Sequence, residues 1–261
     1  MPSNETDRAL YGRMSRALNS TGRPILFSLC QWGESRVWEW GGEIAQMFRI
    51  QMDHLPFWSL PTRADGVGFG QGTKEIIEWM AALRPSTMSA AWSHPDPDFL
   101  MTLFPPTMDF IASRTEFTFW CMWSSPLLVA TDLRNMTVEV RHRPLVFAGL
   151  TQLYICPPGL ATMLRIQQTY LYQKRHILTN EMAIAINQDA GMGAADRLSR
   201  DNATGAEVWS RVLSGGDRAV VLYNAHAVRP AAVSVSLSQL NLTGPVTAHD
   251  VWANTSFVAV S

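Results

Sequence analysis

The chain has 261 residues, of which 47% are hydrophobic, and its formal net charge at pH 7 is −1. This length permits one large domain or two small ones, and the apolar content is sufficient for a substantial core. A net charge so close to zero gives no reason to expect binding to nucleic acid or to an anionic membrane, so we expect neither partner.

The first predicted elements are a helix and a buried strand. Residues 1–8 are polar and are predicted to be unstructured, whereas residues 10–18 have helical spacing. The apolar run at residues 25–30 is bounded by turn residues and predicts a fully buried strand of a parallel sheet. A loop at residues 33–42 follows, and a second apolar segment at residues 44–48 leads to the next strand end.

Polar and aromatic side chains follow both of these strand segments. In α/β proteins the loops after the carboxyl ends of strands carry the chemistry, and loops of mixed aromatic and polar character suit sugar rings. Arg49 precedes Asp53 by four residues, so its guanidinium can orient that carboxylate and set its charge. The loop after residues 25–30 contains four candidate binding residues: Gln31, Trp32, Gly33 and Glu34.

The middle of the chain continues the alternation of helices and strands. Residues 75–83 predict an amphipathic helix, residues 86–92 a strand, residues 110–123 an aromatic-rich helix and residues 126–130 a further buried strand. This alternation predicts an α/β fold with parallel strands. The glycines at positions 66, 68, 70 and 72 resemble a dinucleotide-binding loop only superficially, because their spacing is wrong and no predicted strand precedes them.

The character of the sequence changes after residue 205. Residues 208–213, 218–223 and 231–237 are alternating segments rich in β-branched residues, and residues 214–217 are a hairpin signal. These features predict an antiparallel β domain.

Residues 140–173 fit neither pattern. A transmembrane helix is one interpretation of their long apolar run, but Pro157, Pro158 and Gly159 would break such a helix at its middle. The favoured hypothesis is an unspliced intron read in frame, since Val140-Arg141 and Gln173 can be encoded by common intron boundary sequences.

Cysteines and glycosylation sequons indicate the cellular compartment. Cys30, Cys121 and Cys156 are an odd set that cannot all pair internally. Residues 1–8 lack the apolar segment of a signal peptide, so we expect that the natural N-terminal part is absent. Six Asn-x-Ser/Thr sequons favour passage through the secretory pathway, and they begin at Asn4, Asn19, Asn135, Asn202, Asn241 and Asn254.

Five blocks of this sequence, taken in order, resemble the melibiase-type α-galactosidases of glycoside hydrolase family 27. Together they cover roughly residues 9–139 and 174–189, and they are specific as a set although no single block would be. The blocks are Asn19–Gly33 (fifth barrel strand), Phe48–Trp58 (Trp-Arg-x-x-x-Asp-Ile block), Asp96–Leu100 (Asn-Asp-Pro-Asp-Met-Leu strand end), Ser125–Met136 (eighth strand), and residues 177–180 with 185–189 (closing helix).

The resemblance implies the architecture. Residues 1–139 and 174–200 are expected to form strands 5–8 of a (β/α)8 TIM barrel, that is, a partial barrel within the α/β class. Residues 205–261 are expected to form an incomplete antiparallel β-sandwich, and residues 140–173 an insertion. Such proteins would be secreted or lysosomal/vacuolar glycoproteins, and the full-length form is expected to be a homodimer.

The resemblance also implies the chemistry. Retaining glycosidases use two carboxyl groups about 5 to 5.5 Å apart, and the family's acid/base aspartate corresponds to Asp53. Arg49 would bind sugar hydroxyls, although a structural ion pair is the alternative. Gln31 stands where the family usually has a glutamate that reaches the 2-position of the sugar, which leaves the preferred sugar open. Asp98 and Phe99 would line the pocket.

No cofactor or metal is expected from these residues. Asp96 is expected to brace its strand end. A metal site formed by His94, Asp96 and Asp98 is disfavoured because Pro97 stiffens the run and no second ligand cluster stands out.

The family's nucleophile motif, of the type Lys-Tyr-Asp-x-Cys, does not occur in the chain. The cysteine that would form a disulfide bond with Cys30 is missing with it. The expected function is therefore hydrolysis of terminal α-D-galactosyl residues by the full-length enzyme, of which this chain is a truncated form with little or no turnover. The alternatives are an α-N-acetylgalactosaminidase, a β-L-arabinopyranosidase or a non-catalytic carbohydrate-binding remnant.

Overall fold

The computed structural model describes residues 6–60, 70–104, 107–131, 133, 172–191, 193–226 and 229–259. Residues 140–171 of the predicted insertion lie outside the described residues, as do Cys156, two glycines of the glycine-rich run (Gly66 and Gly68), and Asp132 and residues 134–136 of the eighth-strand block. Among the described residues, no helix combines the length and apolar character required to cross a bilayer.

Three short parallel strands form the first sheet, in the order β1 (Ser28–Leu29), β2 (Met47–Arg49) and β3 (His94–Asp96). A further parallel bridge joins Leu100 to Val129. Strands that follow one another in the sequence are also neighbours in the sheet, as in a (β/α)8 barrel, and the predicted α/β class with parallel strands is confirmed. These three strands and the Leu100–Val129 bridge do not close into a barrel within the described residues.

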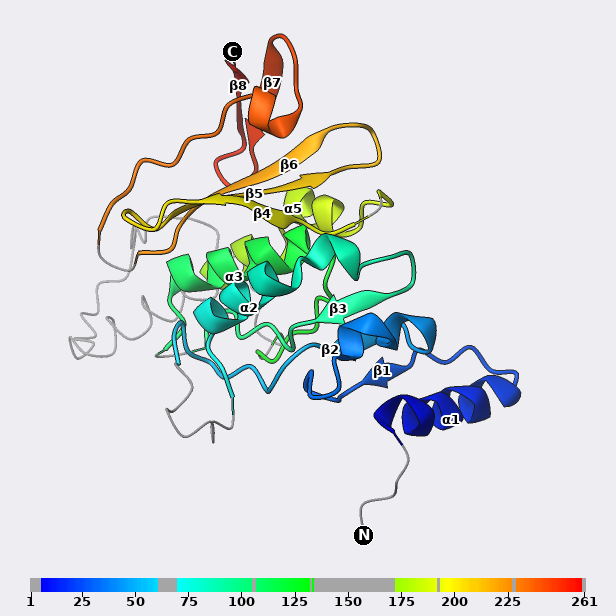
Figure 1. The fold of residues 1–261 in the computed structure, drawn as a ribbon. Helices are drawn as coiled ribbons and strands as arrows, with labels where there is room; N and C mark the ends of the chain where they lie inside the picture. Colours follow the sequence, from blue (N-terminus) through cyan, green and yellow to red (C-terminus); the bar gives the residue numbers. More distant parts are fainter. Residues whose placement is uncertain are drawn as a thin grey trace, which may run out of the picture.

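Two helices cover this sheet, α2 (Thr73–Leu83) and α3 (Phe110–Met122), which confirms the helices predicted at residues 75–83 and 110–123 (Figure 1). The Asp109 side chain caps α3 by accepting a 2.8 Å hydrogen bond from the main-chain N–H of Ala112. Short 3-10 turns, η1 (Val37–Glu39) and η2 (Gly41–Glu43), connect β1 to β2.

The first helix, α1 (Asp7–Ser20), lies beside β1. The Tyr11 hydroxyl donates to the Cys30 carbonyl at 3.1 Å, and the Ser15 hydroxyl donates to the Ile44 carbonyl at 2.7 Å. The helix begins earlier than predicted, since the Thr6 side chain caps it. The prediction that residues 1–8 are unstructured is therefore wrong for its last two residues.

Four predicted strands differ from the structure. In residues 25–30 only β1 is a strand, because only Ser28 and Leu29 pair with β2, and Leu26, which precedes the paired residues, is 69% exposed. Residues 126–130 form a single bridge, and Leu128 is exposed.

The other two differences follow from local backbone geometry and from missing partners. In residues 86–92 the chain forms η3 (Pro85–Thr87) and a turn, because Arg84 and Trp92 both have positive φ angles and interrupt an extended conformation. The strand predicted there begins only at His94. Residues 231–237 contain no strand, because no described strand pairs with them.

An antiparallel sheet lies on the other side of the helices, in the order β4 (Asp196–Arg200), β5 (Ala206–Val212) and β6 (Arg218–Asn224). The hairpin predicted between β5 and β6 is confirmed by Gly216, whose φ is +86°, and by a 2.9 Å bond from the Leu213 N–H to the Asp217 carbonyl. This sheet begins with β4, before residue 205. A two-stranded sheet, β7 (Val246–Asp250) and β8 (Thr255–Ala259), follows the short turn η4 (Ser238–Leu240).

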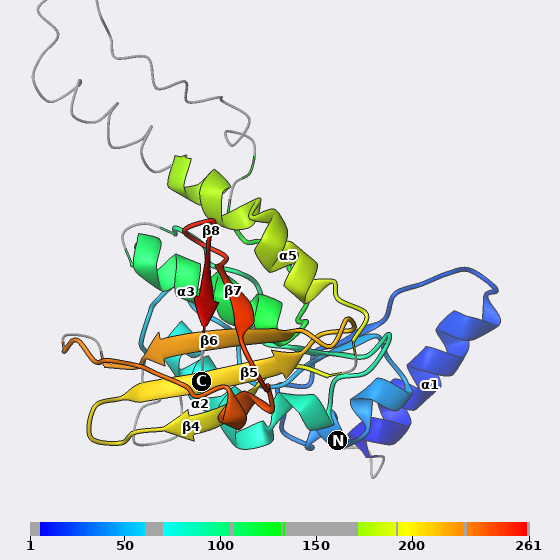
Figure 2. The same ribbon diagram turned by 90° about the horizontal axis from the view of Figure 1, so that it is seen from above.

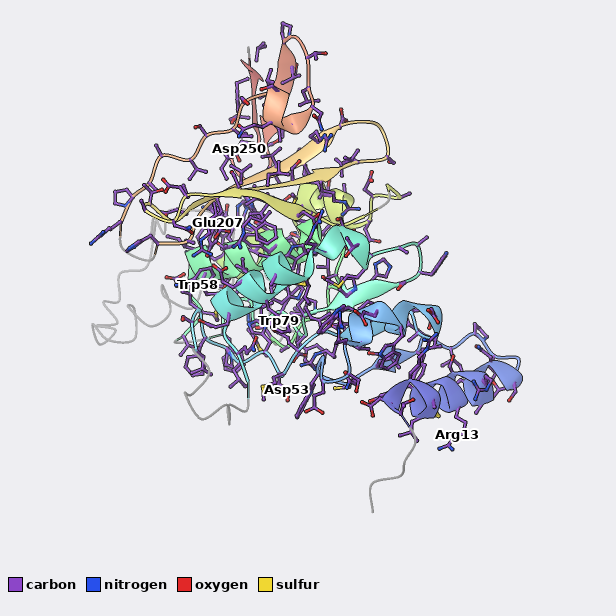
Figure 3. The ribbon with its side chains drawn as sticks, in the orientation of Figure 1. Arg13, Asp53, Trp58, Trp79, Glu207 and Asp250 are labelled. Carbon is purple, nitrogen blue, oxygen red and sulfur yellow. The ribbon has the colours of Figure 1, made fainter. Side chains whose placement is uncertain are left out.

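The antiparallel sheet packs tightly on the helices. The ring of Trp209 in β5 is fully buried, with its centroid 5.1 Å from that of Phe119 and 6.0 Å from that of Trp123. Glu78 of α2 pairs with Arg197 at 2.9 Å and with Arg200 at 2.5 Å. Figure 3 shows Glu207 among these packed layers, whereas Asp53 lies on the opposite side of the helices.

The closing helix predicted near residue 180 is present in two parts, helical residues 172–178 and α5 (Glu181–Asn187), which begins at a cap formed by Asn180. Helices α3 and α5 pack against each other (Figure 2). The Asn187 amide donates to the Ser125 carbonyl at 2.9 Å, and Arg211 of β5 donates to the Ile186 carbonyl at 2.8 Å. The two sheets and their helices therefore form one continuous unit.

We predict that Trp209→Ala lowers the free energy of unfolding by about 3–5 kcal/mol, because it leaves a large cavity between the antiparallel sheet and α3. Chemical denaturation measures the change. The matched control is Trp92→Ala, since Trp92 is 82% exposed, and it should change stability by less than about 0.5 kcal/mol. Equal effects of the two substitutions would contradict the packing described above.

Candidate functional site

The candidate site lies where the three parallel strands end. Cys30 follows β1, Arg49 is the last residue of β2, and Asp98 comes two residues after the end of β3. Arg49 is in register with Asp96 on the neighbouring strand. Because parallel strands end at the same edge of a sheet, the residues that follow them meet there.

Arg49 is the centre of this site. Its Nη2 lies 2.9 Å from Asp53 Oδ1 and 2.7 Å from Asp98 Oδ2, and its Nη1 donates to Cys30 Sγ at 3.9 Å. Only 9% of the Arg49 side chain is exposed, whereas 46% of the Asp53 side chain is exposed. A buried guanidinium needs anionic partners, and the two aspartates supply them. Asp53 is consequently the carboxylate that faces solvent.

The Asp98 turn is held in a left-handed conformation, with φ of +84°. The Asp98 N–H donates to Asp96 Oδ1 at 2.8 Å, and Asp98 Oδ1 accepts the Phe99 N–H at 2.8 Å. Burial raises the pKa of Asp96 to about 6, against the opposing effect of this hydrogen bond. Asp96 thus holds the turn that presents Asp98 to Arg49. Non-glycine residues in this conformation concentrate at functional sites.

The loop after β1 packs closely against the residue that follows β2. Trp32 and Gly33 have φ angles of +59° and +78°. A Cβ atom on Gly33 would lie 2.3 Å from the Ile50 carbonyl oxygen, so only glycine fits there. This close approach leaves the Trp32 ring exposed beside the strand ends.

A second group of predicted residues lines an open hollow of about 350 Å³ between this loop and the start of α1. Gln31 Nε2 donates to Asp7 Oδ2 at 2.9 Å, while Gln31 Oε1 is buried and has no partner among the described residues. The hollow is lined by Asp7, Tyr11, Cys30, Gln31, Trp32 and Glu34.

The structure therefore brings the predicted residues together in two adjacent groups. Arg49, Asp53 and Asp98 contact one another directly, and Phe99 joins them through its N–H. Gln31, Trp32 and Glu34 line the hollow, and Gly33 fixes their loop. Cys30 belongs to both groups, because it lines the hollow and accepts from Arg49.

Cys30 and Cys121 are free thiols in the described part of the chain. The disulfide bond that the family resemblance implies for Cys30 is not present there, and the motif that would supply its partner cysteine does not occur in the chain. Burial strongly raises the pKa of the Cys121 thiol, so this cysteine is a packing residue rather than a nucleophile. No cluster of three or more potential metal ligands occurs among the described residues.

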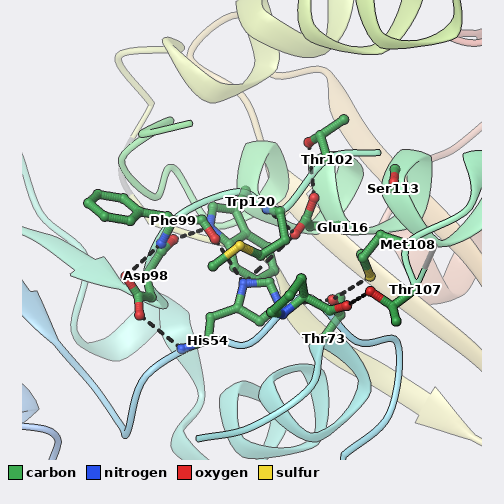
Figure 4. A network of polar contacts seen from close by, with 12 residues as sticks. His54, Thr73, Asp98, Phe99, Thr102, Thr107, Met108, Ser113, Glu116 and Trp120 are labelled. Atoms are coloured by element: carbon green, nitrogen blue, oxygen red, sulfur yellow. Dashed lines mark hydrogen bonds and ion pairs between the residues drawn. The ribbon is translucent and has the colours of Figure 1, made fainter. Parts of the chain in front are cut away.

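Behind the site lies a buried polar network that the sequence analysis did not predict (Figure 4). Oε1 of Glu116 in α3 accepts the Met101 N–H at 2.7 Å, and its Oε2 is hydrogen-bonded to the Thr102 hydroxyl at 3.0 Å. Its Oε1 lies 3.8 Å from Nδ1 of His54, which directly follows Asp53. Burial raises the pKa of Glu116 to about 8 and lowers that of His54 to about 4. Both side chains are therefore neutral near pH 7 and do not form an ion pair.

Most of this chain is similar to known proteins of one family. The family described as "Alpha galactosidase A" matches residues 1–147, and the family described as "Alpha galactosidase C-terminal beta sandwich domain" matches residues 203–261. An alpha-galactosidase of Oryza sativa subsp. japonica is 30% identical over 95% of this chain, and alpha-galactosidase mel1 of Schizosaccharomyces pombe is 29% identical over 94%.

The chain spans about half the length of these curated relatives, 48% of the first and 51% of the second. Among solved structures, alpha-galactosidase I from Mortierella vinacea matches with a TM-score of 0.75 and 24% identity, over 97% of this chain and 58% of that one. The Saccharomyces cerevisiae alpha-galactosidase with raffinose matches with a TM-score of 0.72 and 23% identity, over 95% of this chain and 52% of that one. These two structures share the fold.

We predict a specific pH dependence of stability from Glu116. Its pKa in the folded chain, about 8, lies above the ordinary value of 4.5, so between these pH values the folded chain binds more protons than the unfolded chain. The stability that protonated Glu116 contributes is therefore lost as the pH rises through this window, by up to about 1.4 kcal/mol per pH unit.

The measurement is denaturant unfolding at several pH values for the parent chain and for Glu116→Gln. The parent should lose stability relative to Glu116→Gln as the pH rises from 5 to 8. Glu34→Gln, at an exposed position, is the control and should follow the parent. A constant difference between parent and Glu116→Gln across this window would show that Glu116 is not held protonated.

Proposed function

Because the alpha-galactosidase A family model covers more than half of the chain, the chain belongs to this glycosidase family, and we propose that its site acts on terminal α-linked galactosyl residues. The observation that carries the proposal is the buried Arg49, which holds a solvent-facing Asp53 and a buried Asp98 at the carboxyl ends of parallel strands. The names of the curated relatives support the same substrate class.

Asp53 is the proposed acid/base. Such a residue must reach the glycosidic oxygen, give it a proton and later take a proton from water. Asp53 meets the first requirement, because half of its side chain is exposed while Arg49 fixes Oδ1 and leaves the other oxygen outside this ion pair. Trp32, exposed on the neighbouring loop, offers an apolar face for the sugar ring.

Asp98 is proposed to orient the site rather than to attack the substrate. Asp53 and Asp98 bind the same Arg49 nitrogen, at 2.9 Å and 2.7 Å, so the two carboxylates lie near each other, as the paired carboxyl groups of retaining glycosidases do. The Asp98 oxygens, however, are already engaged: Oδ2 pairs with Arg49 and accepts the His54 N–H, and Oδ1 accepts the Phe99 N–H. A carboxylate engaged in this way has no oxygen directed at a substrate carbon.

The Lys-Tyr-Asp-x-Cys motif that would supply the nucleophile does not occur in the 261 residues. We therefore propose that this chain binds galactosides and has little or no turnover by itself. Gln31 keeps hydrogen-bonding capacity without charge, so an α-N-acetylgalactosaminide or a β-L-arabinopyranoside stays an alternative substrate. A carbohydrate-binding protein without catalysis is the alternative from another functional class.

We predict that the chain binds D-galactose in calorimetry and that Arg49→Ala weakens this binding at least tenfold, because Asp53 and Asp98 lose their shared partner. Hydrolysis of p-nitrophenyl α-D-galactoside should not exceed the background rate. If the parent chain hydrolyses this substrate and Asp53→Asn does not, the proposal that the chain lacks a nucleophile is wrong. The same measurement with aryl α-N-acetylgalactosaminide and β-L-arabinopyranoside separates the alternative substrates, and the absence of binding to all three sugars would overturn the proposal.

We also propose that the protein is a secreted or lysosomal/vacuolar glycoprotein and, at full length, a homodimer. The glycoprotein proposal is supported by a contrast among the described asparagines. The side chains of Asn180, Asn187 and Asn224, which are not in sequons, form hydrogen bonds. The sequon asparagines are exposed, and their side chains have no hydrogen-bond partner in the described ranges: Asn19, Asn202, Asn241 and Asn254.

We predict that mass spectrometry of the protein, secreted from a eukaryotic host, finds glycans on these four sequon asparagines. Asn224 serves as the internal control and should be unmodified, because it lacks a sequon and its side chain donates to the Arg229 carbonyl. Unmodified asparagines at all four sequons would contradict the proposal.

A further inference from the structure

The turn at Asp98 and Phe99 is held by residues from outside its own strand. The His54 N–H donates to Asp98 Oδ2 at 2.9 Å, and Trp120 Nε1 donates to the Asp98 carbonyl at 2.9 Å. A third contact joins His54 Nδ1 to the Phe99 carbonyl at 2.8 Å. His54 therefore contacts both residues of the turn, Asp98 through its main chain and Phe99 through its ring (Figure 4).

The contacts of the His54 ring determine where its proton lies. A carbonyl oxygen only accepts hydrogen bonds, so Nδ1 must carry the proton toward Phe99. The other nitrogen, Nε2, lies 3.0 Å from Thr73 Oγ1 and accepts the hydroxyl proton. The neutral ring with its proton on Nδ1 thus uses its full hydrogen-bonding capacity, and the Thr73 hydroxyl then directs its proton to Nε2 rather than to Met108 Sδ, which lies 3.9 Å away.

The surroundings keep this ring in place. His54 is only 2% exposed, and its ring centroid lies 5.5 Å from that of Trp120. Thr73 is the first residue of α2, and Trp120 belongs to α3. Since burial lowers the pKa of His54 to about 4, the ring stays neutral at physiological pH. The ring therefore connects the Asp98 turn to both helices that cover the sheet.

We propose that His54 is a positioning residue of the candidate site, acting through Asp98. Its main-chain N–H and its Nδ1–H hold the left-handed Asp98 turn, which places the Asp98 carboxylate 2.7 Å from Arg49. Arg49 in turn fixes Asp53. The position of the solvent-facing carboxylate thus depends on the residue that directly follows it in the sequence. The effect on sugar binding rests on the proposed function, whereas the effect on the turn does not.

Two substitutions separate this role from simple packing. In His54→Asn the amide nitrogen is bonded to Cγ, as Nδ1 of histidine is. The variant therefore retains a donor for the Phe99 carbonyl. In His54→Gln the amide nitrogen and oxygen lie one bond further from Cβ, at the same level as Nε2 of histidine. The variant therefore retains the Thr73 contact and loses the donor to the Phe99 carbonyl. Both substitutions remove the ring, and denaturant unfolding checks that the two variants have similar global stability.

Hydrogen exchange measured by nuclear magnetic resonance tests the proposal. Exchange of the Trp120 indole N–H and of the Phe99 amide should be at least tenfold faster in His54→Gln than in His54→Asn. Equal exchange in the two variants overturns the proposal. If either variant does not fold, the ¹⁵N shifts of His54 in the parent chain decide, since the proposal requires a ring protonated on Nδ1 from pH 5.5 to 8. A ring protonated on Nε2, or one that titrates in this range, overturns it.

Calorimetry with D-galactose separates this inference from the proposed function. Affinity should fall about tenfold in His54→Gln relative to His54→Asn. If the parent chain does not bind galactose while the exchange difference is found, the proposed function is wrong and the positioning role of His54 stands. If galactose binds equally to both variants and their exchange rates are equal, the positioning role is wrong and the proposed function stands.

Discussion

One buried guanidinium governs the arrangement of the site. Arg49 is removed from water at the end of β2, and it is stable there because Asp53 and Asp98 neutralise it from two different loops. Its neighbours follow from this requirement: Asp98 needs its left-handed turn, and the turn needs the donors that His54 and Trp120 supply. The carboxylate that faces solvent is therefore positioned by a chain of buried contacts rather than by its own loop.

Much of this arrangement could be predicted from local sequence. The spacing of Arg49 and Asp53, the loop that begins at Gln31 and the segment ending at Asp98 all follow strand ends, and parallel strands bring such positions together. Helices with long periodic patterns, such as α2 and α3, were predicted within two residues at each end. These features depend on residues close together in the sequence, where periodicity and turn residues carry the information.

The remainder depends on partners that local patterns do not identify. An apolar run such as residues 25–30 is compatible with a buried strand, but only Ser28 and Leu29 pair with a neighbouring strand. The segment at residues 231–237 alternates correctly and still pairs with no described strand. The contact between His54 and Glu116 joins a loop to the middle of α3. Sequence periodicity does not predict such a contact, because each of the two residues has the pattern of an ordinary polar residue in the sequence.

Helices α2 and α3 face two ways. Thr73, Glu116 and Trp120 lie on the side of the candidate site. On the side of the antiparallel sheet, Glu78 contacts Arg197 and Phe119 contacts Trp209. The C-terminal sheet and the candidate site therefore share the same two helices, and the sheet cannot be replaced without affecting their packing. A graft that repacked β5 would shift the helices on which the loops of the candidate site rest, so the geometry of that site depends on a sheet that lies outside it.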